Sequence, residues 1–242
     1  MIQDNFNYDH DSNGERWILK TLADAKLLTN AFDVGANQGD WTALVLEVNP
    51  SAVVHSFEIC PPTFQKLSTR FAEDKRVILN ESGLSDSEGE IEMKYSTDDT
   101  LSSMFEVVCS QRVQAIRAKV TRGKDYCLRR NLEAISFLKV DVEGAEHLVL
   151  SGFDDLLNPA RIPIVQFEYG MVNIVTKFLL RDFYSFFERR GYKVGKLFPK
   201  RVRFRDYRFE DEDLRGPNFV AASAERVPLL RGNVDVEQPE TG

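Results

Sequence analysis

A change of hydrophobic period at a glycine turn is the sequence feature that most constrains the fold. Residues 31–34 form a short, mostly apolar segment that stops at Gly35. Beyond Gly39 the apolar residues recur at the spacing of one helix face, at Trp41, Leu44, Val45 and Val48. A short apolar run followed by that spacing predicts a buried strand, a tight turn and a helix.

The same pattern recurs along most of the chain. Further strands are predicted at residues 53–57, 77–79, 90–95, 135–141, 162–167, 192–198 and 219–222. Helices are predicted over residues 17–28, after Pro61, after Gly144 and over 175–186. Strands that alternate with helices favour right-handed crossovers. We therefore predict an α/β fold with a doubly wound, mostly parallel sheet and helices on both faces.

The pattern also predicts how the chain is divided. Residues 1–29 are expected to be a helical lead-in whose polar start, residues 1–14, is frayed. Residues 30–223 are expected to form the main domain, and residues 224–242, which have little apolar content, a flexible tail. The length of 242 residues suits one α/β domain of the larger kind.

Composition narrows the class of protein. A hydrophobic fraction of 43% excludes wholesale disorder, and no apolar run approaches the roughly 20 residues of a membrane helix. The N-terminus has neither a basic region nor an apolar stretch, so no secretory signal is expected. Three cysteines without close pairing fit a reduced, cytoplasmic protein. A net charge of −7 argues against nucleic acid as the main partner.

Open α/β sheets bind ligands beyond the carboxyl ends of their strands, which directs attention to the turn at residues 33–39. Gly35 and Gly39 allow the backbone to approach a ligand closely. Asp33 would repel a pyrophosphate but attract a cationic amino-acid group. An ordinary strand–helix turn is the alternative. Glu58 ends the next strand, where a carboxylate can accept both hydroxyls of a ribose, or can simply be a solvated acid.

A third cluster of polar residues follows the strand at 135–141. Asp141, Glu143 and His147 lie close together in sequence, and spacing predicts that Glu143 and His147 share a helix face. Such groups could serve as general base, substrate clamp or metal ligands. Glu143 could also merely favour the helix dipole. A divalent metal is not favoured and no metal ligand is assigned, because no further clustered histidines support one.

Four motifs together resemble a known family. They are D-V-G-A-N-Q-G at 33–39 with Thr42, the pair Phe57-Glu58, G-L-S-D at 83–86 and K-V-D-V-E-G-A-E at 139–146. In combination they resemble the FkbM family of S-adenosylmethionine-dependent methyltransferases, over about residues 30–222. The resemblance implies the class I methyltransferase (Rossmann-like) fold, with seven strands of which the last is antiparallel. It also implies O-methylation of a hydroxyl on a sugar, glycoside or natural product.

The resemblance implies a cofactor site and a catalytic group. S-adenosylmethionine, which becomes S-adenosylhomocysteine, would be bound by Asp33, Gly35, Ala36, Asn37, Gly39, Thr42, Glu58, Ile59, Gly83, Leu84, Ser85 and Asp141. We expect Asp141 or Glu143 to orient or deprotonate the acceptor hydroxyl, with His147 and Glu168 in reserve. Ile59-Cys60 before Pro61 departs from the family pattern, and so does the segment 121–125.

Two other functions compete with this one. An NAD-dependent oxidoreductase is disfavoured by Asp33 and by the missing G-x-G-x-x-G. A non-catalytic nucleoside-binding protein stays open. The acceptor is expected to meet the loops 96–118, 170–177 and 200–216, whose candidate stacking residues are Tyr95, Phe105, Tyr169, Met171 and Tyr207. The basic strand at 200–205 could bind an anionic acceptor, or its arginines could pair with the acids that follow.

Overall fold

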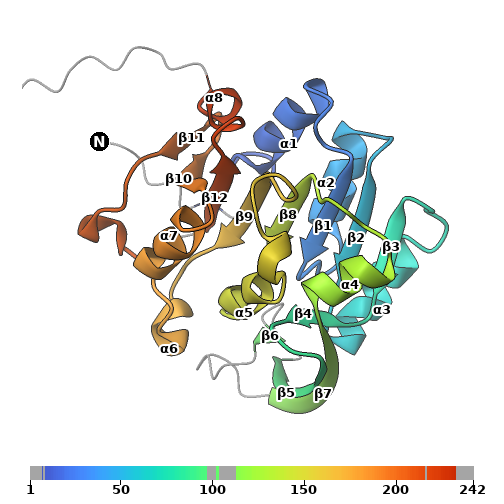
Figure 1. Ribbon diagram of the computed structural model, residues 1–242. Coiled ribbons are helices and arrows are strands. Elements are labelled where there is room, and N and C mark those ends of the chain that lie inside the picture. The colour runs from blue at the N-terminus through green and yellow to red at the C-terminus, as the bar shows by residue number, and fades with distance from the viewer. Residues whose placement is uncertain (1–6, 8, 97–101, 104–112, 216, 233–242) are drawn as a thin grey trace, which may run out of the picture.

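The computed structural model describes residues 7, 9–96, 102–103, 113–215 and 217–232, and every statement below concerns these residues. Their largest element is an eight-stranded sheet of order β11-β10-β12-β9-β8-β1-β2-β3 (Figure 1). Its strands are β1 (Asn30–Val34), β2 (Val53–Phe57), β3 (Val77–Asn80), β8 (Phe137–Val140), β9 (Ile164–Glu168), β10 (Tyr192–Phe198), β11 (Arg201–Phe204) and β12 (Asn218–Ser223).

The five strands from β3 to β9 are parallel to one another, whereas β12, β10 and β11 each run antiparallel to a neighbour. This confirms the predicted mostly parallel, doubly wound α/β sheet. The strand number of seven is wrong, because β11 folds back on β10 and adds an eighth strand at the edge, where Val202 pairs with Leu197.

A second, four-stranded sheet of order β4-β7-β5-β6 lies near the carboxyl ends of the parallel strands (Figure 1). Its strands are β4 (Gly83–Ser85), β5 (Gly89–Ser96), β6 (Ser102–Ser103) and β7 (Val113–Arg122). The strand predicted at 90–95 is therefore confirmed. The expected loop over 96–118 is partly strand β7, and residues 97–101 and 104–112 lie outside the described residues.

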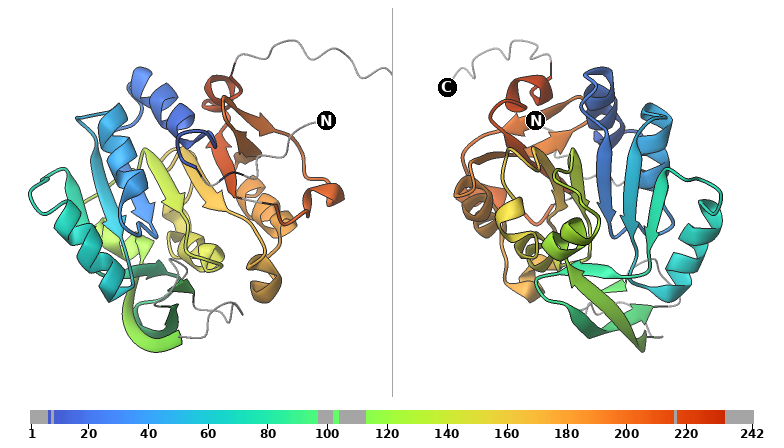
Figure 2. Two further views of the ribbon diagram at one scale, coloured as in Figure 1. Left: turned by 180° about the vertical axis from the view of Figure 1, so that it is seen from behind. Right: turned by 45° about the vertical axis from the view of Figure 1, so that its right-hand side comes forward.

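Helices cover both faces of the main sheet, as Figure 2 shows. They are α1 (Glu15–Asp24), α2 (Asp40–Val48), α3 (Pro61–Arg70), α4 (Gly123–Arg129), α5 (Glu146–Ser151), α6 (Asn173–Thr176), α7 (Leu180–Glu188) and α8 (Val227–Leu230), with short 3₁₀ turns at Asp154–Leu156 and Phe209–Asp211. One buried cluster joins the sheet to α1, α2, α3 and α8, and the other joins it to α4, α5 and α7.

The period of two along the strands explains these two layers. Phe137 and Leu138 are neighbours in β8, both fully buried, yet they belong to opposite clusters. A strand with both faces covered needs apolar side chains in succession. Each such side chain contributes about 2–3 kcal/mol on full burial. This is why the chain shows short continuous apolar runs rather than strict alternation.

Two local expectations need correction, and the segment that departs from the family pattern can be placed. The single helix predicted over 175–186 is two helices, because Lys177 adopts a left-handed backbone with φ of 58° and ends α6. The departing segment at 121–125 is the end of β7 and the start of α4. The predicted flexible tail does not begin at residue 224, since α8 packs on the core and Leu230 is fully buried.

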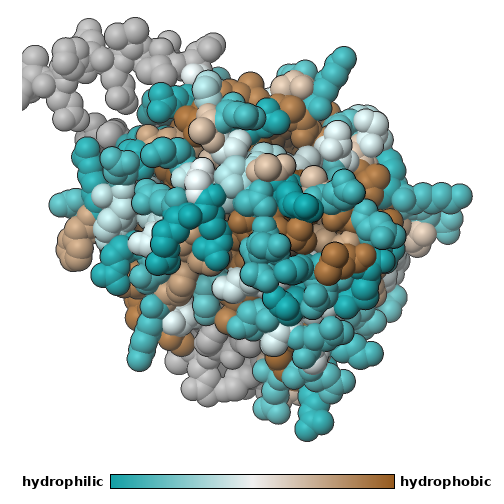
Figure 3. All heavy atoms as spheres, in the orientation of Figure 1, coloured by the Kyte–Doolittle hydropathy of each residue, from teal (hydrophilic) through white to brown (hydrophobic). Residues whose placement is uncertain are grey.

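The lead-in helix also packs on the main domain. Ile18, Leu19 and Leu22 of α1 are fully buried in the same cluster as Val45 of α2. The proposed division at residue 30 stays a prediction. Hydrophilic side chains cover most of the face seen in Figure 3, with apolar patches between them. Among the described helices, none has both the length and the apolar character needed to cross a bilayer.

Candidate functional site

A cavity of about 360 Å³ lies where β1, β2 and β8 end and the smaller sheet begins. Its position agrees with the rule that open α/β sheets bind ligands beyond the carboxyl ends of their strands. The cavity is lined by the turn after β1, the residues after β2, strand β4, the loop after β8 and one residue of the N-terminal segment.

The turn after β1 forms one wall. Gly35, Ala36 and Asn37, which are among the expected cofactor residues, line the cavity. Gly35 has φ of 84°, and a Cβ there would lie 1.7 Å from the backbone oxygen of Asp141, so only glycine fits. Gly39 does not line the cavity; it begins α2 with φ of 85°. The turn therefore brings backbone, rather than side chains, to a ligand.

Two predicted cofactor residues lie beneath this wall rather than in it. Asp33 and Thr42 are fully buried and do not line the cavity. Thr42 Oγ1 donates to Asp33 at 2.7 Å, and Lys139 Nζ lies 3.4 Å from the same carboxylate. Asp33 therefore acts on the cavity indirectly, by holding Lys139, which lines it. Its expected direct contact with a cationic ligand has no support in this arrangement.

Glu58 is held rigidly at the end of β2. Its carboxylate lines the cavity and is only 7% exposed. One oxygen accepts the backbone N–H of Asn37 at 2.9 Å, and the other accepts that of Cys60 at 2.8 Å. Burial raises the pKa of Glu58, and these two backbone donors oppose that rise. Each oxygen keeps a second lone pair for a ligand hydroxyl.

One end of the cavity is apolar. Four predicted residues line the cavity here, namely Ile59, Gly83, Leu84 and Ser85. A Cβ on Gly83 would lie 2.8 Å from Ile59 Cδ1, so the glycine keeps this slot open. Ile91, Met93 and Val120 of the smaller sheet also line it, and sequence reasoning missed them. The alternation over 90–95 predicted their strand but not which face would meet the cavity.

The opposite end is acidic. Asp141 and Glu143 line the cavity, and their carboxylate oxygens lie within 4.8 Å of one another and of Glu168. Burial and then repulsion by Asp141 raise the pKa of Glu143 to about 7. Burial and the same repulsion raise the pKa of Glu168 well above its usual value, and Glu168 hydrogen-bonds Asp141. The spacing of these oxygens would suit a divalent cation, and the raised pKa values of Glu143 and Glu168 follow from the closeness of like charges as well as from burial.

Lys139 keeps Asp141 ionised. Its Nζ lies 3.1 Å from Asp141, whose side chain is 36% exposed. Burial acts to raise the pKa of Asp141, but the charge of Lys139 and the hydrogen bonds with Glu168 and Lys139 together outweigh it, and the pKa falls. Burial likewise acts to lower the pKa of Lys139, and the charges of Asp141, Asp33 and Glu15 reverse that effect. A fixed cation thus sits between the glycine turn and the acidic end.

His147 is not brought to the cavity. It stacks on Phe178 with ring centroids 4.9 Å apart and does not line the wall. The predicted shared helix face with Glu143 is wrong, because Glu143 has φ of 54° and α5 begins only at Glu146. Glu146 instead closes the loop, since its Oε1 accepts the N–H groups of Val142 and Gly144, each at 3.1 Å.

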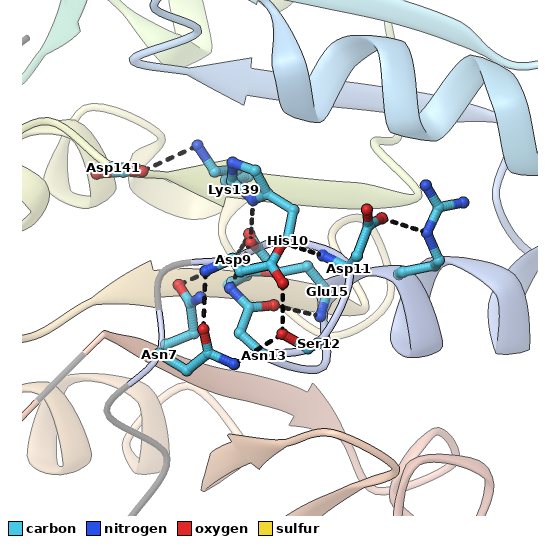
Figure 4. A network of polar contacts seen from close by, with 12 residues as sticks. Asn7, Asp9, His10, Asp11, Ser12, Asn13, Glu15, Lys139 and Asp141 are labelled. Carbon is cyan, nitrogen blue, oxygen red and sulfur yellow. Dashed lines mark hydrogen bonds and ion pairs between the residues drawn. The ribbon is translucent and has the colours of Figure 1, made fainter.

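His10 is a further site residue that sequence reasoning missed. It lines the cavity from the N-terminal segment, and its Nδ1 contacts the carboxylate of Glu15. Figure 4 shows its ring on the side of the segment that faces Lys139 and Asp141. The expectation of a frayed start is wrong for these residues, because hydrogen bonds within the segment, such as Ser12 N–H to the carbonyl of Asp9 at 3.0 Å, order it.

The comparisons with known proteins agree with the motifs. A family model described as the methyltransferase FkbM domain matches residues 33–194. The chain belongs to the FkbM methyltransferase family. A 31-O-demethyl-FK506 methyltransferase FkbM from Streptomyces tacrolimicus is 29% identical over 154 residues, covering 51% of this chain and 59% of that protein.

Two further proteins extend the comparison. A 2-O-methyltransferase NoeI from Sinorhizobium fredii is 26% identical over 143 residues, covering 53% of this chain and 59% of that protein. The match therefore spans less than two thirds of the length of either curated relative. A crystal structure of methyltransferase FkbM from Methylobacillus flagellatus has a TM-score of 0.53 at 15% identity and covers 81% of this chain and 44% of that one, which shows the common fold.

The expected acceptor residues are placed in part. Tyr169 is fully buried, and its hydroxyl donates to Glu212 at 2.5 Å, so it belongs to the core. Tyr207 is partly buried and bonds the same carboxylate, at 3.1 Å. Met171 is 67% exposed. Phe105 and the side chain of Tyr95 lie outside the described residues.

The basic strand pairs with the acids that follow it. Arg205 forms an ion pair with Asp211. Lys196 Nζ lies 3.9 Å from Asp213 and donates to the carbonyl of Arg215 at 2.8 Å. These contacts favour the internally paired interpretation of residues 200–205.

Proposed function

We propose that this chain is an S-adenosylmethionine-dependent O-methyltransferase whose acceptor is a small hydroxylated molecule, a sugar, glycoside or natural product. The observation that carries the proposal is the fixed Glu58 carboxylate between an apolar slot and an acidic end within one cavity. The names of the two curated relatives support the proposal, because one names 31-O-demethyl-FK506 and the other is a 2-O-methyltransferase.

The residues present fit this cofactor. The apolar slot of Ile59, Leu84 and Met93 suits a flat adenine ring. Glu58 is placed to accept the two ribose hydroxyls with its free lone pairs. The backbone at Gly35–Asn37 and the acids at the far end suit an amino-acid group and a cation. When bound, the cofactor supplies a methyl group already activated on a sulfonium.

The protein's own task is to place the acceptor oxygen and keep water out. Asp141 remains an anion near neutral pH because Lys139 lies beside it, so it can accept a hydrogen bond from the acceptor hydroxyl. Glu143, with a pKa of about 7, changes charge in the working range. We assign to these two carboxylates the orientation of the hydroxyl. His147 stays a prediction and gains no support from its position.

Formation of S-adenosylhomocysteine over a panel of sugars, glycosides and macrolides tests the proposal. The wild-type protein should turn over with at least one hydroxylated acceptor. Asp141→Asn and Glu143→Gln should slow that turnover while cofactor affinity is kept. Glu73→Ala, at an exposed position in the turn after α3, is the matched control. Tight cofactor binding without turnover would favour a nucleoside-binding protein, and retention of NAD instead would favour an oxidoreductase; either result overturns the proposal.

A further inference from the structure

His10 and Glu15 form a dyad at the acidic end of the cavity. His10 belongs to a segment that precedes the family match at residues 33–194, yet it lines the same cavity as Asp141 and Glu143. Its Nδ1 contacts Oε2 of Glu15, the first residue of α1. The fold therefore brings an imidazole from outside the matched region to the place where an acceptor would lie.

Glu15 is built to hold that imidazole. It is 1% exposed, and the amide of Gln166 in β9 donates to its Oε1 at 2.6 Å. The amide of Asn13 donates to its Oε2 at 2.8 Å, the oxygen that also contacts His10. A carboxylate fixed by three partners orients the ring and favours the tautomer with its proton on Nδ1. Nε2 is then the proton acceptor, and no described residue bonds it.

We propose that His10 is the general base that removes the proton of the acceptor hydroxyl, with Glu15 as its positioning residue. The inference rests on the proposed function. The hydroxyl proton passes to Nε2 of His10 as the acceptor oxygen bonds the methyl carbon. The carbon–sulfur bond breaks, its electron pair stays on sulfur, and the product is a neutral thioether. The imidazolium then returns its proton to water.

Exposure and charge distinguish the role of His10 from that of the three carboxylates. The carboxylate oxygens of Asp141, Glu143 and Glu168 lie within 4.8 Å of one another, which suits them to hold a hydroxyl by hydrogen bonds. The His10 side chain is 39% exposed, so its proton can reach solvent. A buried anion behind an imidazole stabilises the imidazolium formed on proton transfer.

Charged groups around His10 set its proton affinity. The hydrogen bond to Glu15 raises its pKa, burial opposes the rise, and Lys139 lowers it while Asp141 raises it. Asp9, next to it in sequence, adds a further electrostatic interaction. The net pKa lies above the usual value. The neutral, competent form therefore grows as pH rises through that pKa, and turnover should rise with it.

Carbon-detected histidine NMR tests the placement without any acceptor. The chain has three histidines, and His10→Gln identifies the signal of His10. Its pKa should exceed 6.5 and should fall by about one unit in Glu15→Gln, as expected on loss of a close opposite charge. Asp11→Asn is the matched control, because Asp11 is exposed and pairs with Arg16. Saturation with sinefungin, a cationic cofactor analogue, should lower the His10 pKa more than S-adenosylhomocysteine does.

Turnover tests the role. With an acceptor from the panel, His10→Gln should lower kcat about 10²–10⁴-fold while S-adenosylmethionine affinity stays within about twofold. Glu15→Gln should move the rising limb of the pH profile to lower pH. Should Glu15→Gln fail to fold, the turnover of His10→Gln, a substitution at a partly exposed position, still tests the role of His10. A kcat within about threefold of wild type, or a His10 signal that ignores saturating sinefungin, overturns the inference. Absence of cofactor binding by wild type would instead overturn the proposed function.

Discussion

The two ends of the cavity are built in different ways. The proposed cofactor end, with Gly35, Glu58 and Leu84, comes from three short segments within residues 33–86, each of them in a strand or directly after one. The acceptor end joins His10 to Asp141 and Glu143, which lie more than a hundred residues away in sequence. The first end is determined by local backbone constraints, and the second by how distant segments pack. The difference predicts separable effects of substitution.

The largest effect is expected where the two ends meet. Lys139→Met would leave the fully buried Asp33 without its cation. Removal of one partner of a buried ion pair costs about 3–5 kcal/mol. Urea unfolding should show that loss, and cofactor affinity should fall with it. Lys193→Met, an exposed site on β10, is the control. A loss below about 1 kcal/mol would show that the two ends are not held together by this lysine.

The next effect concerns the turn after β1, where the backbone of the cofactor end closely approaches that of Asp141. Gly35→Ala adds a Cβ that would meet the backbone oxygen of Asp141 at 1.7 Å, at φ of 84°. Strain and overpacking of this kind cost about 2–4 kcal/mol. Gly170→Ala, where an added Cβ meets nothing within 4 Å, should be nearly neutral. Equal melting temperatures for the two variants would contradict the close approach of the turn to β8.

The stability of the folded protein should depend on pH through Glu146, which closes the loop at the acceptor end. Burial raises its pKa to about 7 from 4.5, so the folded state binds a proton that the unfolded chain lacks. Stability from this group is full below about pH 4.5 and declines as pH rises to 7, by about 3 kcal/mol at most. Glu146→Gln keeps the acceptor oxygen for Val142 and Gly144 and should flatten that decline. If the free energy of unfolding, measured in urea, falls equally with pH in wild type and Glu146→Gln across pH 5–7, this role of Glu146 is refuted.

The smallest effect lies outside both ends. Arg205→Gln removes the ion pair with Asp211, and partly exposed pairs contribute up to about 1 kcal/mol. Cofactor affinity and turnover should stay unchanged. A turnover defect confined to anionic acceptors would instead return the basic strand to the acceptor site.

Much of the fold could be predicted because local pattern determines it. The period change at Gly35 and the apolar runs at β8 and β9 locate the parallel strands, since a strand covered on both faces must be apolar throughout. β11 was missed as an eighth sheet strand because the number came from the resemblance. The break at Lys177 was missed because an unfavourable backbone conformation at one residue leaves no hydrophobic signal.

Site residues fixed by local sequence pattern could likewise be predicted, and those placed by packing of distant segments could not. Glu58 and the glycine turn could be located since a strand end fixes their position. Asp33 and Thr42 were expected at the ligand, but they hydrogen-bond each other, are fully buried and do not line the cavity. His10 could not be found, because only the packing of α1 on the sheet places it near Asp141. A polar segment carries no period from which such a contact could be inferred.

Isothermal calorimetry with S-adenosylmethionine tests the separate construction of the two ends most directly. Wild type and His10→Gln should bind with affinities within about twofold of each other. Glu58→Ala should lose about 10–100-fold, the equivalent of about 1.5–3 kcal/mol for hydrogen bonds to a charged group. Folded wild-type protein that binds no cofactor, or a Glu58→Ala variant that binds as wild type does, would contradict the account.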